Sequence, residues 1–202
     1  KLPASTGSDW FVSSANRVYS QTDGGFDYEL WLDGIRKGRT FITNGPSLQL
    51  TVADAEPGET LQVDRGARVP AYVHWISHFP VERVEIIVNG NVAGCRDFVD
   101  GATTGHLETE LTIDADGWIA ARLGSGSRDS FNQPIWAHTS PIYIAGTGSQ
   151  SDASSQSAAY FTEKIEEGVQ WVKTKGRFYT NGQRKEVIEL FRQGQDWYRN
   201  RS

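Results

Sequence analysis

The stretch that decides the fold is Val84-Glu85-Ile86-Ile87-Val88-Asn89-Gly90-Asn91-Val92-Ala93. Branched apolar residues dominate its first half, as in a buried β-strand, and an Asn-Gly pair follows them. Asn-Gly supplies the two positive φ angles that a tight type I′ hairpin requires. The stretch therefore predicts that residues 91–93 return beside residues 86–88 as the second strand of an antiparallel hairpin.

Similar short strands occupy residues 47–145 on both sides of this hairpin. In residues 107–113, for example, apolar and polar side chains alternate, which is typical of a strand with one buried face. Turn residues separate nearly every pair of strands, and this favours an antiparallel sandwich over a sheet crossed by helices. We expect a mainly β chain with an immunoglobulin-like antiparallel β-sandwich, whose inward side chains include Val84, Ile86, Val88, Leu111, Ile113 and Trp118.

The residues before position 47 have a different pattern. Asp27 is the expected N-cap of a helix, and Gly38 is its expected stop. One face of that helix is apolar and consists of Tyr28, Trp31, Leu32 and Ile35. Short extended segments flank it, and this order of elements predicts that residues 1–46 are the C-terminal tail of an α/β barrel domain.

Residues 146–202 form a third part. The Gly-, Ser- and Gln-rich run from Gly146 to Ser157 predicts a flexible connection. Two amphipathic helices follow, the first capped by Ser157 and ended near Gly176. Their apolar stripes are Phe161, Ile165, Val169 and Val172 in the first helix, and Val187, Leu190, Phe191 and Tyr198 in the second. We expect this helical pair to clamp the sandwich to the barrel.

The composition limits the choice of partners. The 202 residues include 20 Lys and Arg against 25 Asp and Glu, and no long basic run stands out. This balance argues against nucleic acid and against an anionic membrane surface as partners. The single cysteine, Cys95, excludes an internal disulfide framework. Because the chain opens with Lys1 and contains no methionine, we expect it to be a fragment, a processed chain or a trimmed piece.

Several blocks of the sequence carry a family resemblance. Residues 31–46, WLDGIRKGRTFITNGP, resemble the LxxGRTFVTNGP junction of the CehA/McbA-type metallohydrolases, which belong to the PHP superfamily. Residues 56–60, 84–90, 116–120 and 137–143 resemble later segments of that family in the same order. The resemblance implies the C-terminal portion of a metal-dependent hydrolase, in which an α/β (PHP-type) barrel precedes the sandwich. The family's histidine-rich metal motifs are absent from this sequence.

The resemblance implies one metal ligand, Asp9. Gly7-Ser8-Asp9-Trp10 resembles the end of the last metal-bearing barrel strand, although Phe11 stands where many PHP proteins have a histidine. From its chemistry alone, Asp9 would be a loop carboxylate that caps a turn. The resemblance implies a divalent metal ion (Zn, Mn or Fe) for the complete enzyme and none for this chain alone. It also implies two partners, namely the missing N-terminal barrel part of the same protein and a small-molecule substrate at the junction.

The remaining candidates favour structural roles. His74 and His78 would lie about 13 Å apart on one strand, too far for a single ion. His106 is expected in a loop without a visible partner, and His138 as a hydrogen-bonded structural residue. Cys95 is expected to be a small packing residue on the return strand of the hairpin. The Gly-Ser run 124–127 lacks the features of a dinucleotide loop and is interpreted as a hairpin loop.

The alternative hypothesis is a non-catalytic β-sandwich module that binds carbohydrate or protein. Seven tryptophans are many for a chain of this length, although core packing accounts for most of them. An exposed Trp136 or Trp10 would offer a stacking surface for a sugar or an aromatic ligand. This hypothesis differs from the first in requiring no catalytic partner domain.

Overall fold

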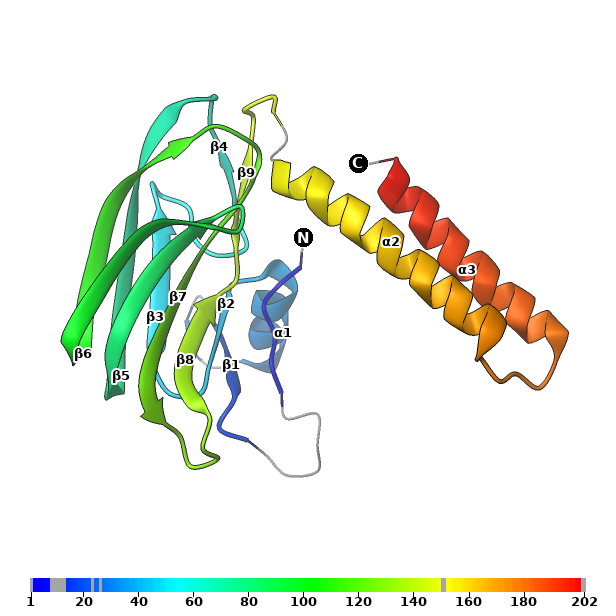
Figure 1. The fold of residues 1–202 in the computed structure, drawn as a ribbon. Helices are drawn as coiled ribbons and strands as arrows, with labels where there is room; N and C mark the ends of the chain where they lie inside the picture. The colour runs from blue at the N-terminus through cyan, green and yellow to red at the C-terminus, as the bar shows by residue number, and fades with distance from the viewer. Residues whose placement is uncertain (1, 8–13, 23, 26, 150–151, 201–202) are drawn as a thin grey trace. The chain divides into compact units, whose positions relative to one another are not determined.

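The computed structural model describes residues 2–7, 14–22, 24–25, 27–149 and 152–200. It divides into two compact units, Lys1–Ser149 and Gln150–Ser202, which are described separately below. The first unit is mainly β, and the second is a helical hairpin (Figure 1). The sequence predicted three parts, with boundaries after residues 46 and 145, and that division stays a prediction.

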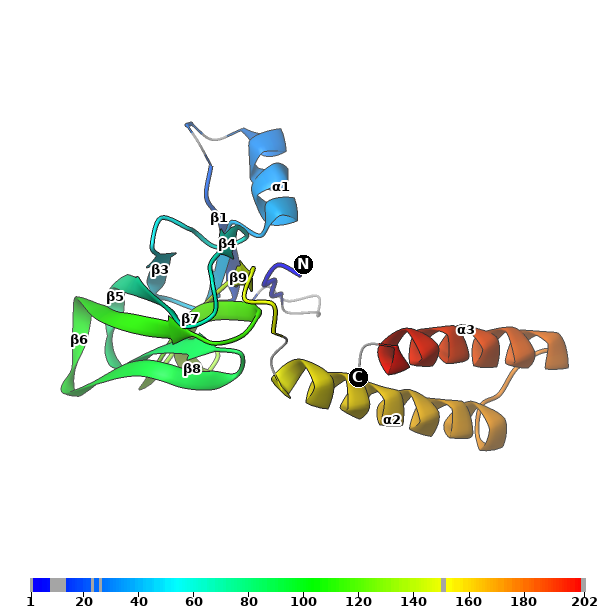
Figure 2. The same cartoon turned by 90° about the horizontal axis from the view of Figure 1, so that it is seen from above.

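A long hairpin dominates the first unit (Figures 1 and 2). It consists of β5 (Ala67–Val88) and β6 (Asn91–Ile113), which pair from Val88↔Asn91 at one end to Ala67↔Ile113 at the other. Asn89 and Gly90 have φ angles of 49° and 87°, which confirms the predicted tight turn. The sequence predicted short strands in this region, whereas residues 67–88 form one continuous strand, whose pairing with β6 shifts register between Ile76 and Arg83.

The partners of β5 change along its length, and this folds the sheet over. Its first half pairs with β3 (Ser47–Val52), whereas its second half pairs with β7 (Gly117–Arg128). From β7 the sheet continues through β8 (Pro134–Thr139) and β2 (Thr40–Thr43) to β1 (Arg17–Ser20), and β9 (Ile142–Ala145) joins β7 to the short β4 (Thr60–Gln62). All pairs are antiparallel except β4 with β9.

The apolar core lies where β3 passes over β7 and β8. Its largest fully buried side chains include Trp75, Leu48, Ile86, Ile113, Ile119 and Ile142. Of the side chains predicted to point inward, Val84, Ile86, Leu111 and Ile113 are buried, which confirms those predictions. Val88 is half-buried and packs against this core, as predicted. Trp118 is half-buried and lies outside the core cluster, whereas Trp75 is fully buried within it.

The N-terminal segment belongs to the same sheet as the later strands. Strand β2 pairs with β1 on one side and with β8 on the other, so residues 17–43 extend the sheet directly. The pairing of β2 with β8 links two of the parts that the sequence predicted. The sequence did not indicate this pairing, because strand partners distant in sequence leave no local signal. The assignment of residues 1–46 to a barrel tail stays a prediction.

Helix α1 (Tyr28–Lys37) has the ends that the sequence predicted. The side chain of Asp27 accepts hydrogen bonds from the backbone N–H groups of Glu29 and Leu30. Gly38 ends the helix in the left-handed conformation at φ 76°, and its N–H donates to the Gly34 and Ile35 carbonyls. Buried Gly34 lets the helix approach β1 closely, because a Cβ there would collide with the Ser20 hydroxyl.

The second unit is an antiparallel pair, α2 (Asp152–Thr174) and α3 (Asn181–Arg199). Helix α2 begins well before the expected cap, so Ser157 lies inside it, and the predicted flexible connection is too long. Val169 and Val172 are buried as predicted, whereas Leu190 is 69% exposed and does not join the expected stripe. Whether the pair clamps other parts of the protein stays a prediction.

No helix among the described residues is both long enough and apolar enough to cross a lipid bilayer.

Candidate functional site

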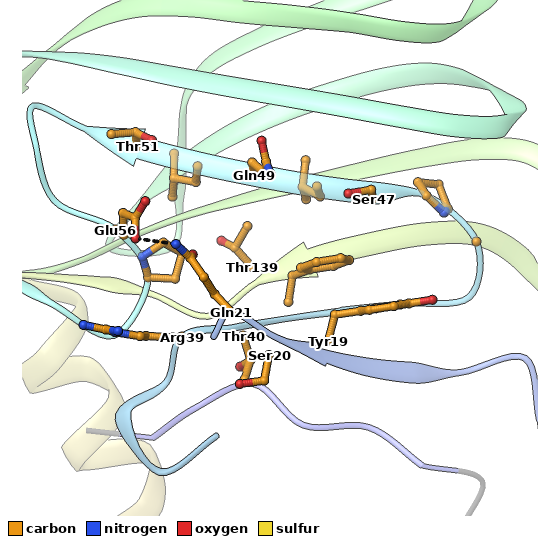
Figure 3. A pocket seen from close by; sticks show the side chains of 16 residues that line it. Tyr19, Ser20, Gln21, Arg39, Thr40, Ser47, Gln49, Thr51, Glu56 and Thr139 are labelled. Atoms are coloured by element: carbon orange, nitrogen blue, oxygen red, sulfur yellow. Dashed lines mark hydrogen bonds between the residues drawn. The ribbon is translucent and has the colours of Figure 1, made fainter. Parts of the chain in front are cut away.

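A cleft in the first unit lies between β3 and the edge formed by β1 and β2 (Figure 3). Its volume is about 570 Å³, which is within the range of about 300–1,000 Å³ typical of small-molecule sites. The lining residues come from the ends of β1 and β2, from the turn between β2 and β3, from β3 itself and from residues 56–57. Five of the 16 lining residues belong to the 31–46 segment that carries the family resemblance.

The turn after β2 separates the two sides of the cleft. Asn44 is only 4% exposed, and its side-chain Oδ1 accepts a hydrogen bond from the Trp136 N–H at 2.8 Å. Its Nδ2 donates to the Pro134 carbonyl at 2.7 Å and to Asp129 Oδ2 at 3.0 Å. Backbone N–H groups of Gln133 and Phe131 and the Asn44 amide outweigh burial and lower the pKa of Asp129, so it accepts as a carboxylate. These bonds fasten the turn to β8 and direct β3 away from β2.

Two aromatic rings form one wall of the cleft. Tyr19 on β1 and Phe41 on β2 are cross-strand partners, so their side chains project from the same face of the sheet. The ring centroids lie 5.0 Å apart with an interplanar angle of 9°, a stacked arrangement. Tyr19 is nevertheless 48% exposed, which leaves a large part of its ring to solvent.

Polar side chains form the opposite rim. Gln21 Nε2 donates to Glu56 Oε2 at 2.9 Å, drawn as the dashed line in Figure 3. The backbone N–H of Glu56 donates in turn to Glu59 Oε2 at 2.9 Å, which orients the loop that carries Glu56. Gln49 and Thr51 add an amide and a hydroxyl from β3. The rim therefore combines hydrogen-bond donors and acceptors beside an aromatic surface.

The lining is close to electrical neutrality. Among the described residues around the cleft, Arg39 is the one cation and Glu56 the one anion. Hydroxyl and amide groups make up the rest of the polar lining. Sequence reasoning gave Tyr19, Gln21 and Glu56 no role, because their proximity depends on strand pairing and on a loop over 30 residues further along the chain.

The positions of His74 and His78 agree with the sequence prediction, whereas that of His106 does not. His74 and His78 do lie on one strand, β5, as predicted. His106 is in β6 rather than in a loop, directly opposite His74. The ring of Tyr72 stacks on that of His106 with centroids 5.8 Å apart, so His106 has a partner. Within the described ranges, no group of three or more His, Cys, Asp or Glu residues is placed to hold a metal ion.

Three smaller expectations have mixed outcomes. Cys95 lies on the return strand β6 as predicted, but it is exposed, so the packing role is wrong. The run 124–127 is part of β7 and not a hairpin loop, because it continues the pairing with β8. His138 lies within β8, where its Nδ1 is 2.6 Å from the Thr139 carbonyl oxygen.

Trp136, a candidate stacking residue of the alternative hypothesis, is half-buried. Asp9 and Trp10 lie outside the described residues.

The fold and the cleft define a mainly β domain with a neutral, ligand-sized cleft, joined in sequence to a helical hairpin. No family model matches the chain, and no curated protein matches it either. Among solved structures, it is similar to the solution structure of a CARDB domain from Pyrococcus furiosus at 12% identity and a TM-score of 0.30. That similarity covers 50% of this chain and 96% of the CARDB chain.

Proposed function

We propose that this chain is the C-terminal part of a PHP-type metal-dependent hydrolase that cleaves an ester, amide or phosphoester bond. In this proposal the β unit is an immunoglobulin-like accessory domain, and residues 1–46 include the end of the barrel. Most of the metal site would lie in the missing barrel part, with Asp9 as the ligand that this chain contributes.

The observation that carries the proposal is the position of the junction segment. Residues 31–46, which hold the most specific part of the resemblance, form α1, β2 and the turn fixed by Asn44. Five residues of this segment line the cleft: Arg39, Thr40, Phe41, Gly45 and Pro46. The segment thus joins helix and sheet and also shapes a surface that a small molecule could contact.

A divalent ion would supply a bound hydroxide that attacks the scissile bond. Such an ion requires at least three protein ligands and an open position. The described residues hold no such group, so the proposal places the other ligands on earlier barrel strands. The residues of this chain would then support the barrel and line the approach to it.

Hydrolysis assays on two proteins test the proposal. One protein is this chain, and the other is the product of the complete reading frame that encodes it. Both are assayed with p-nitrophenyl esters, an anilide and bis-p-nitrophenyl phosphate, with and without added Zn²⁺ or Mn²⁺. We expect chelator-sensitive turnover from the complete product only. Absence of turnover from the complete product with every substrate and metal would contradict the proposal, as would equal turnover from this chain.

A further inference from the structure

We infer that the cleft between β3 and the β1–β2 edge is a binding site for one sugar ring of a neutral oligosaccharide. This inference goes beyond the proposed hydrolase and does not depend on it, because all of the residues involved belong to the described β unit. It assigns a ligand class to Tyr19, Gln21 and Glu56, which the proposed function leaves without a role.

The aromatic wall supplies the first requirement of a sugar site. A pyranose presents a flat patch of C–H groups, which packs on an aromatic face and removes apolar surface from water. Phe41 supports Tyr19 from one side at a centroid distance of 5.0 Å, so the tyrosine ring is held in place before any ligand arrives. A ring held in this way loses little conformational entropy on binding.

The polar rim supplies the second requirement. The edge of a sugar ring carries hydroxyl groups, each of which both donates and accepts hydrogen bonds. Gln21 and Glu56 already form an amide–carboxylate pair at 2.9 Å, and such a pair keeps further acceptor and donor capacity for a ligand hydroxyl. Thr51 lies along the same rim (Figure 3).

The charge and size of the cleft exclude other ligand classes. An anionic ligand would need several cations or N–H groups, whereas Arg39 is the one cation among the described lining residues, and Glu56 lines the same cleft. A wholly apolar ligand would remove water from the remaining polar atoms of the Gln21–Glu56 pair and offer them no hydrogen bond in exchange. The volume of about 570 Å³ suits a ligand of drug-like size, as one or two sugar rings would be.

Titration calorimetry and saturation-transfer NMR with named neutral oligosaccharides test the inference. The probes are cellohexaose, xylohexaose, mannohexaose and maltohexaose, with inorganic phosphate and glucuronic acid as charged comparisons. We expect at least one neutral oligosaccharide to bind and the charged probes not to bind. Tyr19→Ala and Gln21→Ala should weaken that binding about tenfold, whereas Tyr19→Phe should preserve most of it.

Tyr72→Ala is the matched control, because Tyr72 is also an exposed, stacked aromatic residue but lies on β5 outside the cleft. Its binding should equal that of the unaltered protein. Each variant is first checked for an unchanged circular dichroism spectrum and melting temperature. The inference is overturned if none of the four oligosaccharides binds at about 1 mM. It is also overturned if Tyr19→Ala binds normally, if Tyr72→Ala weakens binding equally, or if only the charged probes bind. Hydrolase activity plays no part in these readouts, so the two proposals can fail separately.

Discussion

Replacing Trp75 by alanine tests whether the core is arranged as described. Trp75 is fully buried on β5, and its ring meets Phe98 edge-on with centroids 5.2 Å apart. Gly105 is its cross-strand partner, and a Cβ at that glycine would lie only 2.6 Å from Trp75 Cζ2. The large ring therefore occupies the space that the absent side chain of Gly105 leaves across the hairpin.

The expected cost of Trp75→Ala follows from this burial. Removing a fully buried tryptophan costs about 3–5 kcal/mol, because the transfer free energy and a cavity term both contribute. Trp118→Ala is the matched control, since Trp118 is only half-buried and leaves a smaller cavity. For that variant we expect a loss of about 1–2 kcal/mol.

Urea unfolding followed by far-UV circular dichroism measures the loss in free energy of unfolding for each of the two variants. Dichroism is preferred to fluorescence, because seven tryptophans contribute to the emission. The β-strand signal should shift to a much lower midpoint for Trp75→Ala than for Trp118→Ala. Equal midpoints for the two variants, or a larger loss for Trp118→Ala, would show that the core has been placed wrongly.

Two other perturbations address the turn and the helical hairpin. Asn44→Ala should cost about 1–3 kcal/mol in urea unfolding, because it removes the hydrogen bonds that the buried Asn44 side chain makes with the partly buried N–H of Trp136 and the carbonyl of Pro134. Asn91→Ala, at an exposed position, should cost almost nothing. Equal costs for the two variants would refute the role of the turn. Hydrogen bonds from Arg192, then Gln170 and Gln195, lower the pKa of Glu166 from 4.5 to about 2. A depressed carboxyl pKa contributes stability above its unfolded value, so helical stability should fall as the pH falls from about 4.5 towards 2. Thermal melts across that range should show that the melting temperature changes less steeply with pH in Glu166→Gln than in the unaltered protein. The exposed control Glu163→Gln should keep the slope of the unaltered protein. Identical slopes for the unaltered protein and both variants would contradict the stabilising role of Glu166.

The sequence predicted the elements whose signals are local. Asn89-Gly90 identified the hairpin turn, and Asp27 and Gly38 identified the ends of α1, because each acts through its own backbone geometry. The continuity of β5 was missed, since Pro80 within it normally interrupts a central strand. There the pairing with β6 shifts register, which accommodates the proline.

The cleft could not be predicted in the same way. Tyr19 and Phe41 are 22 positions apart, and only the pairing of β1 with β2 makes them neighbours. Gln21 and Glu56 meet through a loop that no periodic pattern describes. Asn44-Gly45-Pro46, between β2 and β3, is rich in turn-forming residues, and this composition is a local sequence signal for the turn at which the two strands diverge.

The metal content of the complete protein tests the central claim most directly. The product of the complete reading frame is purified without added metal and analysed by inductively coupled plasma mass spectrometry, beside its Asp9→Ala variant and this chain alone. The account predicts a stoichiometric divalent ion in the complete protein, a reduced content in Asp9→Ala and less still in this chain. A complete protein without bound divalent metal, even after incubation with Zn²⁺, Mn²⁺ or Fe²⁺, would contradict the assignment to a metal-dependent hydrolase.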